Sequence, residues 1–375
     1  MNKSLNSLGL MSGTSGDGVD ASVINSDGKG YYKVLTNKYF QYTDDISQNI
    51  YNLKSNINKL EDIKKFSKEI NDLERKITLF HSNVVLKCTK NNDFVIDLIG
   101  FHGQTILHSS KDKYSKQLGD GKLLSQLSKK KVIYNFRQKD LLEGGEGAPL
   151  SPIFHHLVVK EKKIDLPVCI LNIGGISNLT LIKDLNEENL ISKDIGPGNC
   201  LINEWMRRNK KGNYDKNGEL ANSGKTNELI LNQALEDFEN ILDKNINSFD
   251  VNDFEINFLR GLDVENGAST ITDFTGSIIA SRLSREILKS NKKVSNVILC
   301  GGGRKNKTLI ERIKSYSDQK LKFETTDDYG VDGDFVESQA FAYLAIRSFL
   351  KLPISFPSTT GCTRPTTGGV YAKNF

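Results

Sequence analysis

The sequence predicts an α/β protein made of two domains that share a duplicated plan and face each other across a central cleft. The chain has 375 residues, which is enough for two domains of ordinary size. An apolar run, a turn of small residues and an alternating run occur twice, at Leu8–Ile24 and at Cys169–Ile182. A buried-strand run that stops at glycine also occurs twice, at Val95–Thr105 and at Val294–Asn306. The same order of elements in both halves indicates the duplication.

Each predicted element rests on a local pattern. The two hairpins follow from turns of Gly, Ser, Thr or Asn beside alternating apolar and polar residues. A helix is expected before each glycine-ended strand, because apolar residues recur there at helical spacing. The second of these helices is expected to start after Thr272–Asp273 or Thr275, which resemble N-caps. The apolar faces of the two helices are Leu73, Ile77, Phe80 and Val84, and Ile279, Leu283, Ile287 and Leu288.

The domain boundary is expected between Pro152 and Pro167, which gives an N-terminal domain over 1–155 and a C-terminal domain over 156–375. The second domain is enlarged by a helical, Asn- and Lys-rich insertion at about 209–259, and it ends in a helix expected over Phe335–Leu350. A cleft between two such domains is the usual place for a small-molecule ligand.

The composition narrows the class of protein and its partners. The net charge of +5 is the balance of 51 basic and 46 acidic residues, and these are interspersed. We therefore expect neither nucleic acid nor a membrane as a partner. The five cysteines are scattered without a C-x-x-C pair, which indicates free thiols in a reducing compartment. Nothing in the sequence resembles a signal peptide or a membrane span, so a cytoplasmic location is expected.

The stretch "GLMSGTSGDGVDAS" (Gly9–Ser22) is a candidate phosphate-binding turn. Glycines let backbone N–H groups approach phosphate oxygens, and Thr14 and Ser15 add hydroxyl donors. Asp17 would hold Mg²⁺ through water or orient a hydroxyl. A plain hairpin turn without a ligand is the competing interpretation. The chain has neither a Walker lysine motif nor a G-x-G-x-x-G in Rossmann context, so those nucleotide sites are not expected.

Two further glycine turns are expected in the second half. "NIGGISN" (Asn172–Asn178) matches the opening turn in plan, and two such turns can grip phosphates from both sides. "CGGGRKN" (Cys300–Asn306) ends a strand in three glycines, a shape that lets a flat adenine ring pass.

Three segments carry candidate catalytic and substrate-binding side chains. In "DIGPGN" (Asp194–Asn199), Asp194 is a candidate general base, and an N-cap for the next helix is the alternative. His102 and Gln104 are expected in a loop just after a strand. Arg137 can grip a carboxylate and Asp140 can bind hydroxyls, although a surface ion pair would also suit them. Histidines at metal-ligand spacing are absent from the sequence.

Taken together, "GTSGDGVD", "GFHGQT", "FRQKD…GGEGAP", "NIGGISN", "DIGPGN" and "CGGGRKN" resemble the motifs of the 1,6-anhydro-N-acetylmuramic acid kinase family, which belongs to the actin-like and sugar-kinase ATPase superfamily. The match runs in order through nearly the whole chain. The resemblance implies two actin-like (ribonuclease H-like) domains around a cleft. It also implies a homodimer that uses ATP and Mg²⁺ to convert the anhydro sugar and water into N-acetylmuramic acid 6-phosphate and ADP in cell-wall recycling.

The resemblance assigns a role to each motif. Asp194 matches the catalytic base, and Gly13–Asp20 matches the ATP phosphate segment. The expected nucleotide-binding residues are Gly13, Thr14, Ser15, Gly16, Asp17, Gly18, Val19, Asp20, Asn172, Gly174, Gly175, Gly301, Gly302 and Gly303. The expected sugar-binding residues are His102, Gln104, Arg137, Asp140 and Glu337, and the expected metal contact is Asp17 through water.

Two residues depart from the family pattern. Glu146 stands where the family usually has glutamine, and Ile195 stands where threonine is usual. The loss of the threonine hydroxyl removes one expected phosphate or water contact. Two other functions stay open at this point: a kinase of the same fold that acts on another sugar, and an actin-like ATPase whose output is a conformational change or a filament.

Overall fold

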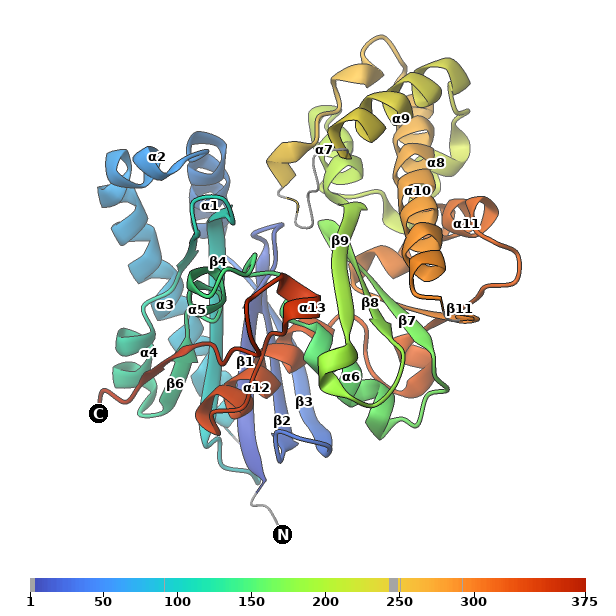
Figure 1. Cartoon of the computed structure of the whole chain (residues 1–375). Helices are drawn as coiled ribbons and strands as arrows, with labels where there is room; N and C mark the ends of the chain where they lie inside the picture. Colours follow the sequence, from blue (N-terminus) through green and yellow to red (C-terminus); the bar gives the residue numbers. More distant parts are fainter. Residues whose placement is uncertain (1–3, 91, 243–248, 250, 292) are drawn as a thin grey trace. The chain divides into compact units, whose positions relative to one another are not determined.

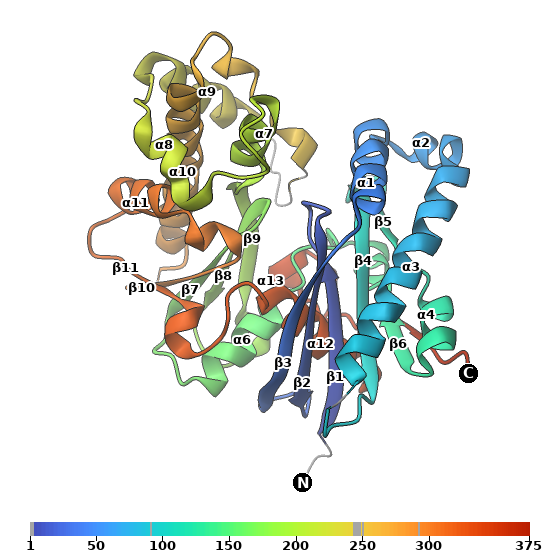
Figure 2. The same ribbon diagram turned by 180° about the vertical axis from the view of Figure 1, so that it is seen from behind.

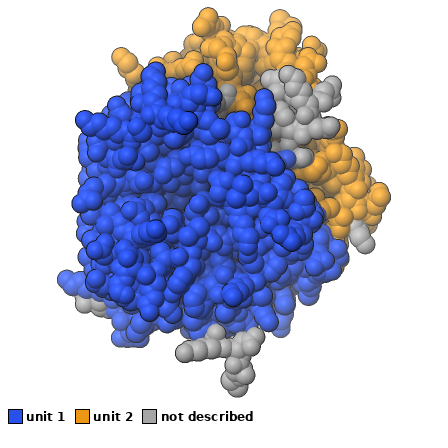
Figure 3. Space-filling view, turned by 60° about the vertical axis from the view of Figure 1, so that its left-hand side comes forward, with its two compact units in different colours: residues 1–164, 185–190, 335–375 blue, residues 165–184, 191–334 orange. Residues whose placement is uncertain are grey.

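The computed structural model describes residues 4–90, 92–242, 249, 251–291 and 293–375 of the chain. The chain divides into two compact units, shown in blue and orange in Figure 3. Unit 1 comprises residues 1–164, 185–190 and 335–375, and unit 2 comprises residues 165–184 and 191–334. The C-terminal segment 335–375 thus belongs with the N-terminal part of the chain, whereas the sequence analysis placed it in the second domain.

Unit 1 is built on a seven-stranded sheet with strand order β12-β6-β4-β1-β2-β3, and β5 pairs with β4 (Figure 1). Its strands are β1 (Leu5–Ser12), β2 (Gly18–Ser26), β3 (Tyr32–Gln41), β4 (Leu98–Ser109), β5 (Tyr114–Leu118), β6 (Lys131–Tyr134) and β12 (Val370–Ala372). Its helices are α1 (Asp44–Asn56), α2 (Leu60–Lys65), α3 (Ser67–Thr89), α4 (Gly121–Ser128), α5 (Gln138–Leu142), α6 (Pro152–Glu161), α12 (Val336–Phe349), α13 (Pro357–Thr360) and the short η1 (Glu187–Asn189).

Helix α12 covers one face of this sheet, and α1 and α3 lie on the other face (Figures 1 and 2). The contact with α12 requires glycine on the strands below it. A Cβ atom on Gly9 would lie 1.9 Å from the carbonyl oxygen of Ser338, and one on Gly100 would lie 2.2 Å from that of Phe341. This close packing of α12 on β1 and β4 explains why the last helix belongs to unit 1.

Unit 2 is built on a five-stranded sheet with strand order β11-β10-β7-β8-β9. Its strands are β7 (Val168–Ile173), β8 (Ile176–Ile182), β9 (Ile191–Pro197), β10 (Asn296–Cys300) and β11 (Lys322–Thr325). Its helices are α7 (Cys200–Arg208), α8 (Glu219–Ser223), α9 (Glu228–Leu242), α10 (Val264–Lys289) and α11 (Lys307–Tyr316), with the short 3-10 helices η2 (Lys216–Gly218), η3 (Val251–Asp253), η4 (Asn257–Leu259), η5 (Gly302–Lys305) and η6 (Thr326–Tyr329).

Five strands of the unit 1 sheet have the same topology as the five strands of the unit 2 sheet. In unit 1, β1, β2 and β3 form an antiparallel meander, β4 pairs parallel with β1, and β6 pairs parallel with β4. In unit 2, β7, β8 and β9 form the meander, β10 pairs parallel with β7, and β11 pairs parallel with β10. The predicted duplication is therefore confirmed, and both predicted hairpins are present.

The start of α10 differs from the sequence-based prediction. The helix begins nine residues before Asp273, after Asp263, whose side chain accepts a hydrogen bond from the Asn266 N–H at 2.8 Å. Asp273 is instead buried in mid-helix, where the Tyr316 hydroxyl donates to it at 2.9 Å. A residue that normally caps helices was misleading here because a neighbouring helix supplies its hydrogen-bond partner. The same prediction placed Leu288 on the packed face, but its side chain is exposed.

Candidate active site

The opening turn connects β1 to β2 and is held from three sides. The Gln104 amide donates to the Gly13 carbonyl at 3.0 Å, the Lys54 ammonium donates to the Thr14 carbonyl at 2.9 Å, and the Tyr42 N–H donates to the Asp17 carbonyl at 2.8 Å. Thr14, Ser15 and Asp17 themselves are exposed. The turn thus has a fixed backbone and side chains that face solvent, which suits a phosphate-binding loop.

Asp17 is oriented by its own turn, because the Ser15 hydroxyl donates to its Oδ1 at 2.6 Å. Within the residues that the structure describes, no cluster of three His, Cys, Asp or Glu side chains is placed to hold a metal. Mg²⁺ in phosphate-transfer sites is commonly held by one or two carboxylates together with water and phosphate. A single exposed and oriented carboxylate at a phosphate turn fits that arrangement.

A buried polar network lies next to this turn. The Ser12 hydroxyl is 2.7 Å from the Tyr42 hydroxyl, and Nδ1 of His81 donates to the Ile77 carbonyl at 2.8 Å. Burial lowers the pKa of His81 to about 4, so the ring is neutral at physiological pH. Sequence analysis missed Tyr42 and Lys54 as supports of the turn. Both lie beyond the motif, in segments that read as an ordinary strand end and an amphipathic helix.

In unit 2, Asp194 lies inside β9, opposite Asn178 of β8, and only 6% of the residue is exposed. The backbone N–H of Phe249 donates to its Oδ2 at 3.0 Å. The N-cap alternative is wrong, because the N-cap of α7 is Asn199. Asp194 lies before the helix, because β9 continues through Pro197. A buried carboxylate on a strand is held more rigidly than a loop residue, as a catalytic base requires.

The three glycine-rich segments of unit 2 converge near the end of β9. The Gly198 N–H donates to the Gly175 carbonyl at 2.9 Å, and the Asn199 N–H donates to the Gly174 carbonyl at 2.8 Å. A Cβ atom on Gly301 would lie 2.4 Å from the Asn172 Oδ1, so the third segment adjoins the first. The structure thus brings together "NIGGISN", "DIGPGN" and "CGGGRKN", which lie far apart in the sequence.

The sequence analysis expected His102 and Gln104 in a loop. In the structure both lie inside β4, and both are buried. The strand continues past the glycines because Gly103 adopts a positive φ of 76° and β4 shifts its register against β1 there. His102 Nδ1 donates to the Gly103 carbonyl at 2.8 Å, which leaves Nε2 as an acceptor. Burial, together with the charge of Arg137, holds the pKa of His102 well below its usual 6.5.

Arg137 and Asp140 are joined through the glycine loop that follows them. The Arg137 guanidinium donates to His102 Nε2 at 3.0 Å and to the Gly147 carbonyl at 2.8 Å. The Gly147 N–H in turn donates to Asp140 Oδ2 at 2.7 Å. The backbone N–H and the backbone carbonyl of Gly147 are therefore each bound by one of the two predicted residues. The alternative of a surface ion pair is wrong for Asp140, which is 1% exposed.

Asp140 also binds two hydroxyl groups of the C-terminal segment. The Ser355 hydroxyl donates to its Oδ1 at 2.5 Å, and the Thr360 hydroxyl donates at 2.7 Å. In this structure the hydroxyls that Asp140 binds are thus those of the protein. Ser355 and Thr360 lie more than 200 residues further along the chain, and the sequence carried no signal of this link.

The remaining predicted residues fall as follows. Glu337 lies in the first turn of α12. Ile195 is fully buried in the core of unit 2, so the side chain at this departure from the family pattern packs among apolar residues. The Glu146 N–H donates to the Thr360 carbonyl at 2.8 Å, which ties the other departure to the C-terminal segment.

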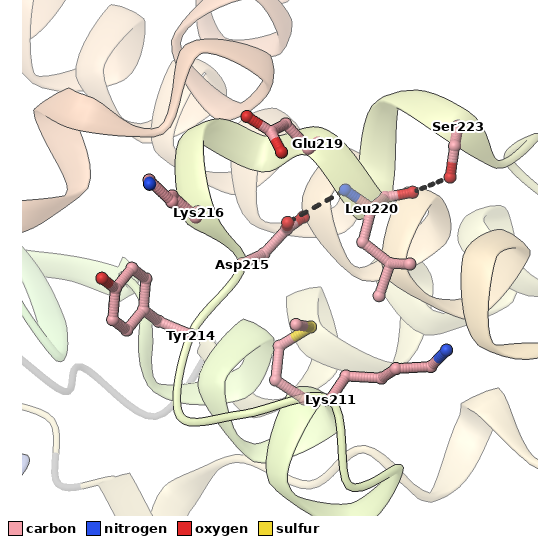
Figure 4. A pocket seen from close by; sticks show the side chains of 8 residues that line it. Lys211, Tyr214, Asp215, Lys216, Glu219, Leu220 and Ser223 are labelled. Atoms are coloured by element: carbon pink, nitrogen blue, oxygen red, sulfur yellow. Dashed lines mark hydrogen bonds between the residues drawn. The ribbon is translucent and has the colours of Figure 1, made fainter.

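Unit 2 also contains an open pocket of about 400 Å³ beside the η2–α8 segment (Figure 4). It is lined by Met206, Lys211, Tyr214, Asp215, Lys216, Glu219, Leu220 and Ser223. The carboxylate of Asp215 is already used within the protein, because it accepts hydrogen bonds from the backbone N–H groups of Leu220 and Ala221, each at 2.9 Å. The pocket was not predicted from the sequence.

Two α/β units of one topology, each with a glycine turn after its first strand, define an actin-like, ribonuclease H-like protein, as the sequence predicted. Among the described helices, none has the length and apolar character to span a bilayer. Two solved structures are similar: the activator of the 2-hydroxyisocaproyl-CoA dehydratase from Clostridium difficile (12% identity, TM-score 0.43, 92% of this chain and 96% of that one) and a ROK family glucokinase from Streptomyces griseus (12%, 0.40, 91% and 99%).

The family model of anhydro-N-acetylmuramic acid kinase matches residues 6–373. The protein of that name from Pelagibacter ubique is 52% identical over the full length of both chains. The one from Zymomonas mobilis is 35% identical over 96% of this chain and 98% of its own. The chain therefore belongs to the anhydro-N-acetylmuramic acid kinase family, and the predicted family and kinase class are confirmed.

Proposed function

We propose that this protein is an ATP-dependent kinase that opens the 1,6-anhydro ring of anhydro-N-acetylmuramic acid and phosphorylates O6. The products would be N-acetylmuramic acid 6-phosphate and ADP, in peptidoglycan recycling. Family membership and the names of its relatives support this substrate. The observation that carries the proposal is the buried carboxylate of Asp194, on a rigid strand that ends where three glycine-rich segments converge.

Asp194 would act as the general base. It takes a proton from a water molecule as the water oxygen bonds to C1 of the sugar, and the bond between C1 and O6 breaks. The released O6 then bonds to the γ-phosphorus, and ADP leaves. The Phe249 N–H donates to Oδ2 of Asp194 and holds the carboxylate in one orientation.

The glycine turns would bind the nucleotide. Backbone N–H groups of Gly13–Gly18 and the hydroxyls of Thr14 and Ser15 are suited to phosphate oxygens. Asp17, oriented by Ser15, would hold Mg²⁺ through water, and the ion would neutralise charge on the phosphates. Lys54 adds a positive charge beside the same turn, where no Walker lysine exists.

The sugar would be bound by the cluster around Arg137. Its guanidinium is oriented by His102 and Gly147, and a planar guanidinium is suited to a carboxylate such as the lactyl group of muramic acid. Glu337, at the start of α12, is a further candidate for a sugar hydroxyl. The proposal also includes a cytoplasmic location and a homodimer. Sedimentation of the purified protein would test the homodimer, and fractionation of cells would test the location.

The decisive experiment uses the purified protein with ATP, Mg²⁺, anhydro-N-acetylmuramic acid and ¹⁸O-labelled water, followed by mass spectrometry. We expect one heavy oxygen at C1 of the product and none on its phosphate. Heavy oxygen on the phosphate would contradict the mechanism. Turnover with another sugar but none with the anhydro sugar would contradict the substrate, and ATP-dependent filaments without a sugar product would indicate an actin-like ATPase.

A further inference from the structure

The three glycines after β10 are not equivalent. Gly301 has a φ of +78°, and a Cβ atom on Gly303 would lie 2.2 Å from the Ile173 side chain, so the fold itself requires glycine at both positions. Gly302 differs, because a Cβ atom there would meet nothing within 4 Å and its φ is ordinary. The fold therefore gives no reason for glycine at 302, and its open surface leaves room for a ligand to approach the backbone.

Arg304 immediately follows this turn, and its side chain is only 6% exposed. Its Nε and one terminal nitrogen donate to the two carboxylate oxygens of Asp327 at 2.6 and 3.0 Å. The other terminal nitrogen donates to Asp334 at 2.6 Å and to the Gly301 carbonyl at 3.1 Å. The guanidinium thus joins the glycine turn to the segment 327–334.

A second link runs beside the first. The Gly301 N–H donates to the Gly333 carbonyl at 3.1 Å, so both polar groups of Gly301 are fixed by the same neighbourhood. A Cβ atom on Gly333 would lie 2.4 Å from Arg304 Nε, so a larger residue there would displace the guanidinium. The hydrogen bond from Arg304 holds the pKa of Asp327 below its usual 3.8, so this pair stays ionised at neutral pH.

We propose that Arg304 is a positioning residue for the nucleotide: by binding the Gly301 carbonyl while it is anchored to Asp327 and Asp334, it holds the open surface at Gly302 in place for the flat adenine base. Three hydrogen bonds to carboxylates fix the guanidinium, and the fourth fixes the Gly301 carbonyl to it, so the turn is tied to a rigid side chain. The inference rests on the proposed use of ATP and gives a role to Arg304, a residue of "CGGGRKN" to which the sequence analysis assigned none.

The test compares Arg304→Gln and Arg304→Lys with the matched control Arg312→Gln. Arg312 lies in α11 of the same unit and pairs with buried Asp273 at 3.2 Å, so it controls for the loss of an ion pair. Calorimetry gives the Kd of the non-hydrolysable analogue AMPPNP, and steady-state kinetics give KM and kcat. For Arg304→Gln we expect the Kd and the KM for ATP to rise about tenfold, with kcat and the sugar KM within about twofold. Lysine cannot bridge two carboxylates and a carbonyl, so Arg304→Lys should restore little.

A folded Arg304→Gln protein that binds AMPPNP as tightly as the wild type would overturn the inference, and so would an equal weakening in Arg312→Gln. If Arg304→Gln does not fold, Asp327→Asn decides the question: it breaks only one arm, and we expect about threefold weaker AMPPNP binding, whereas unchanged binding contradicts the inference. Wild-type protein that fails to bind AMPPNP would instead refute the proposed use of ATP.

Discussion

The guanidinium of Arg137 donates to Nε2 of His102 at 3.0 Å, and this bond is possible because the imidazole is neutral. A protonated ring would carry hydrogen on both nitrogens and would repel the guanidinium. The Gly103 carbonyl fixes the tautomer by accepting from Nδ1. His102 is thus an acceptor that orients a cation, and it is unsuited to act as an acid or a base near neutral pH.

Replacing Arg137 should weaken sugar binding. For Arg137→Gln we expect the KM for the anhydro sugar to rise at least about tenfold, because a charge-assisted pair with a carboxylate is lost. The KM for ATP should change little. Arg364→Gln is the matched control, since this exposed arginine of the same unit pairs with Glu143 at the surface. A sugar KM unaffected by Arg137→Gln would remove this residue from the sugar site.

The low pKa of His102 predicts that the stability of the fold falls as the pH is lowered. The unfolded residue takes up a proton near its usual value of 6.5, whereas the buried residue does not. The unfolded state therefore binds more protons below pH 6.5, and this residue reduces the stability of the fold as the pH falls below that value. His102→Gln removes the effect. Urea midpoints measured from pH 7.5 to 5 should decline less steeply for the variant, and parallel curves would show that His102 does not contribute.

Asp194→Asn should abolish turnover and leave nucleotide binding nearly intact. The amide keeps the shape of the side chain and still accepts from the Phe249 N–H, but it cannot take a proton from water. Loss of at least about a thousandfold in kcat is expected, with AMPPNP binding within about twofold of the wild type. A variant that keeps most of its kcat would show that another residue is the base.

Asp140→Ala should destabilise unit 1. The substitution leaves the hydroxyls of Ser355 and Thr360 and the Gly147 N–H without their buried acceptor. We expect a loss of about 3 kcal/mol, measured as a lower urea midpoint, and a higher sugar KM because the Arg137 support is loosened. Normal stability would mean that water replaces the carboxylate at no cost.

Gly100→Ala should disrupt the packing of α12, because its Cβ atom would lie 2.2 Å from the Phe341 carbonyl oxygen. The backbone carbonyl of Phe341 cannot move away as a flexible side chain can. We therefore expect a destabilisation of about 2 kcal/mol or more. Gly30→Ala is the control, since its Cβ atom would meet only the flexible end of Lys160 at 3.2 Å. Thermal unfolding of both variants separates a local clash from a general effect of alanine; equal melting temperatures would argue against the clash.

The sequence predicted those features that depend on local patterns. Both hairpins and the last helix follow from periodicity and turn residues. The family motifs singled out Asp194, whose role as the base stays a prediction. What could not be predicted depends on distant partners. In the sequence, Asp140 suits a hydroxyl-binding site and a surface ion pair equally well, and only the fold brings Ser355 and Thr360 to it. Asp273 likewise resembles a helix cap until the fold brings the Tyr316 hydroxyl to it. Likewise, the segment 335–375 joins unit 1 through contacts with β1 and β4 that are invisible in a linear chain.

A register shift between β8 and β9 decides which side chain lies opposite Asn178. Ser177 pairs with Gly196, and the next pair is Asn178 with Asp194, because the ladder shifts between Ser177 and Asn178. In a regular ladder Ile195 would lie opposite Asn178. The corresponding strands of unit 1, β2 and β3, have their shift elsewhere, between Val23 and Ile24. One extra residue in β9 thus exchanges an apolar side chain for the carboxylate at this position of the sheet.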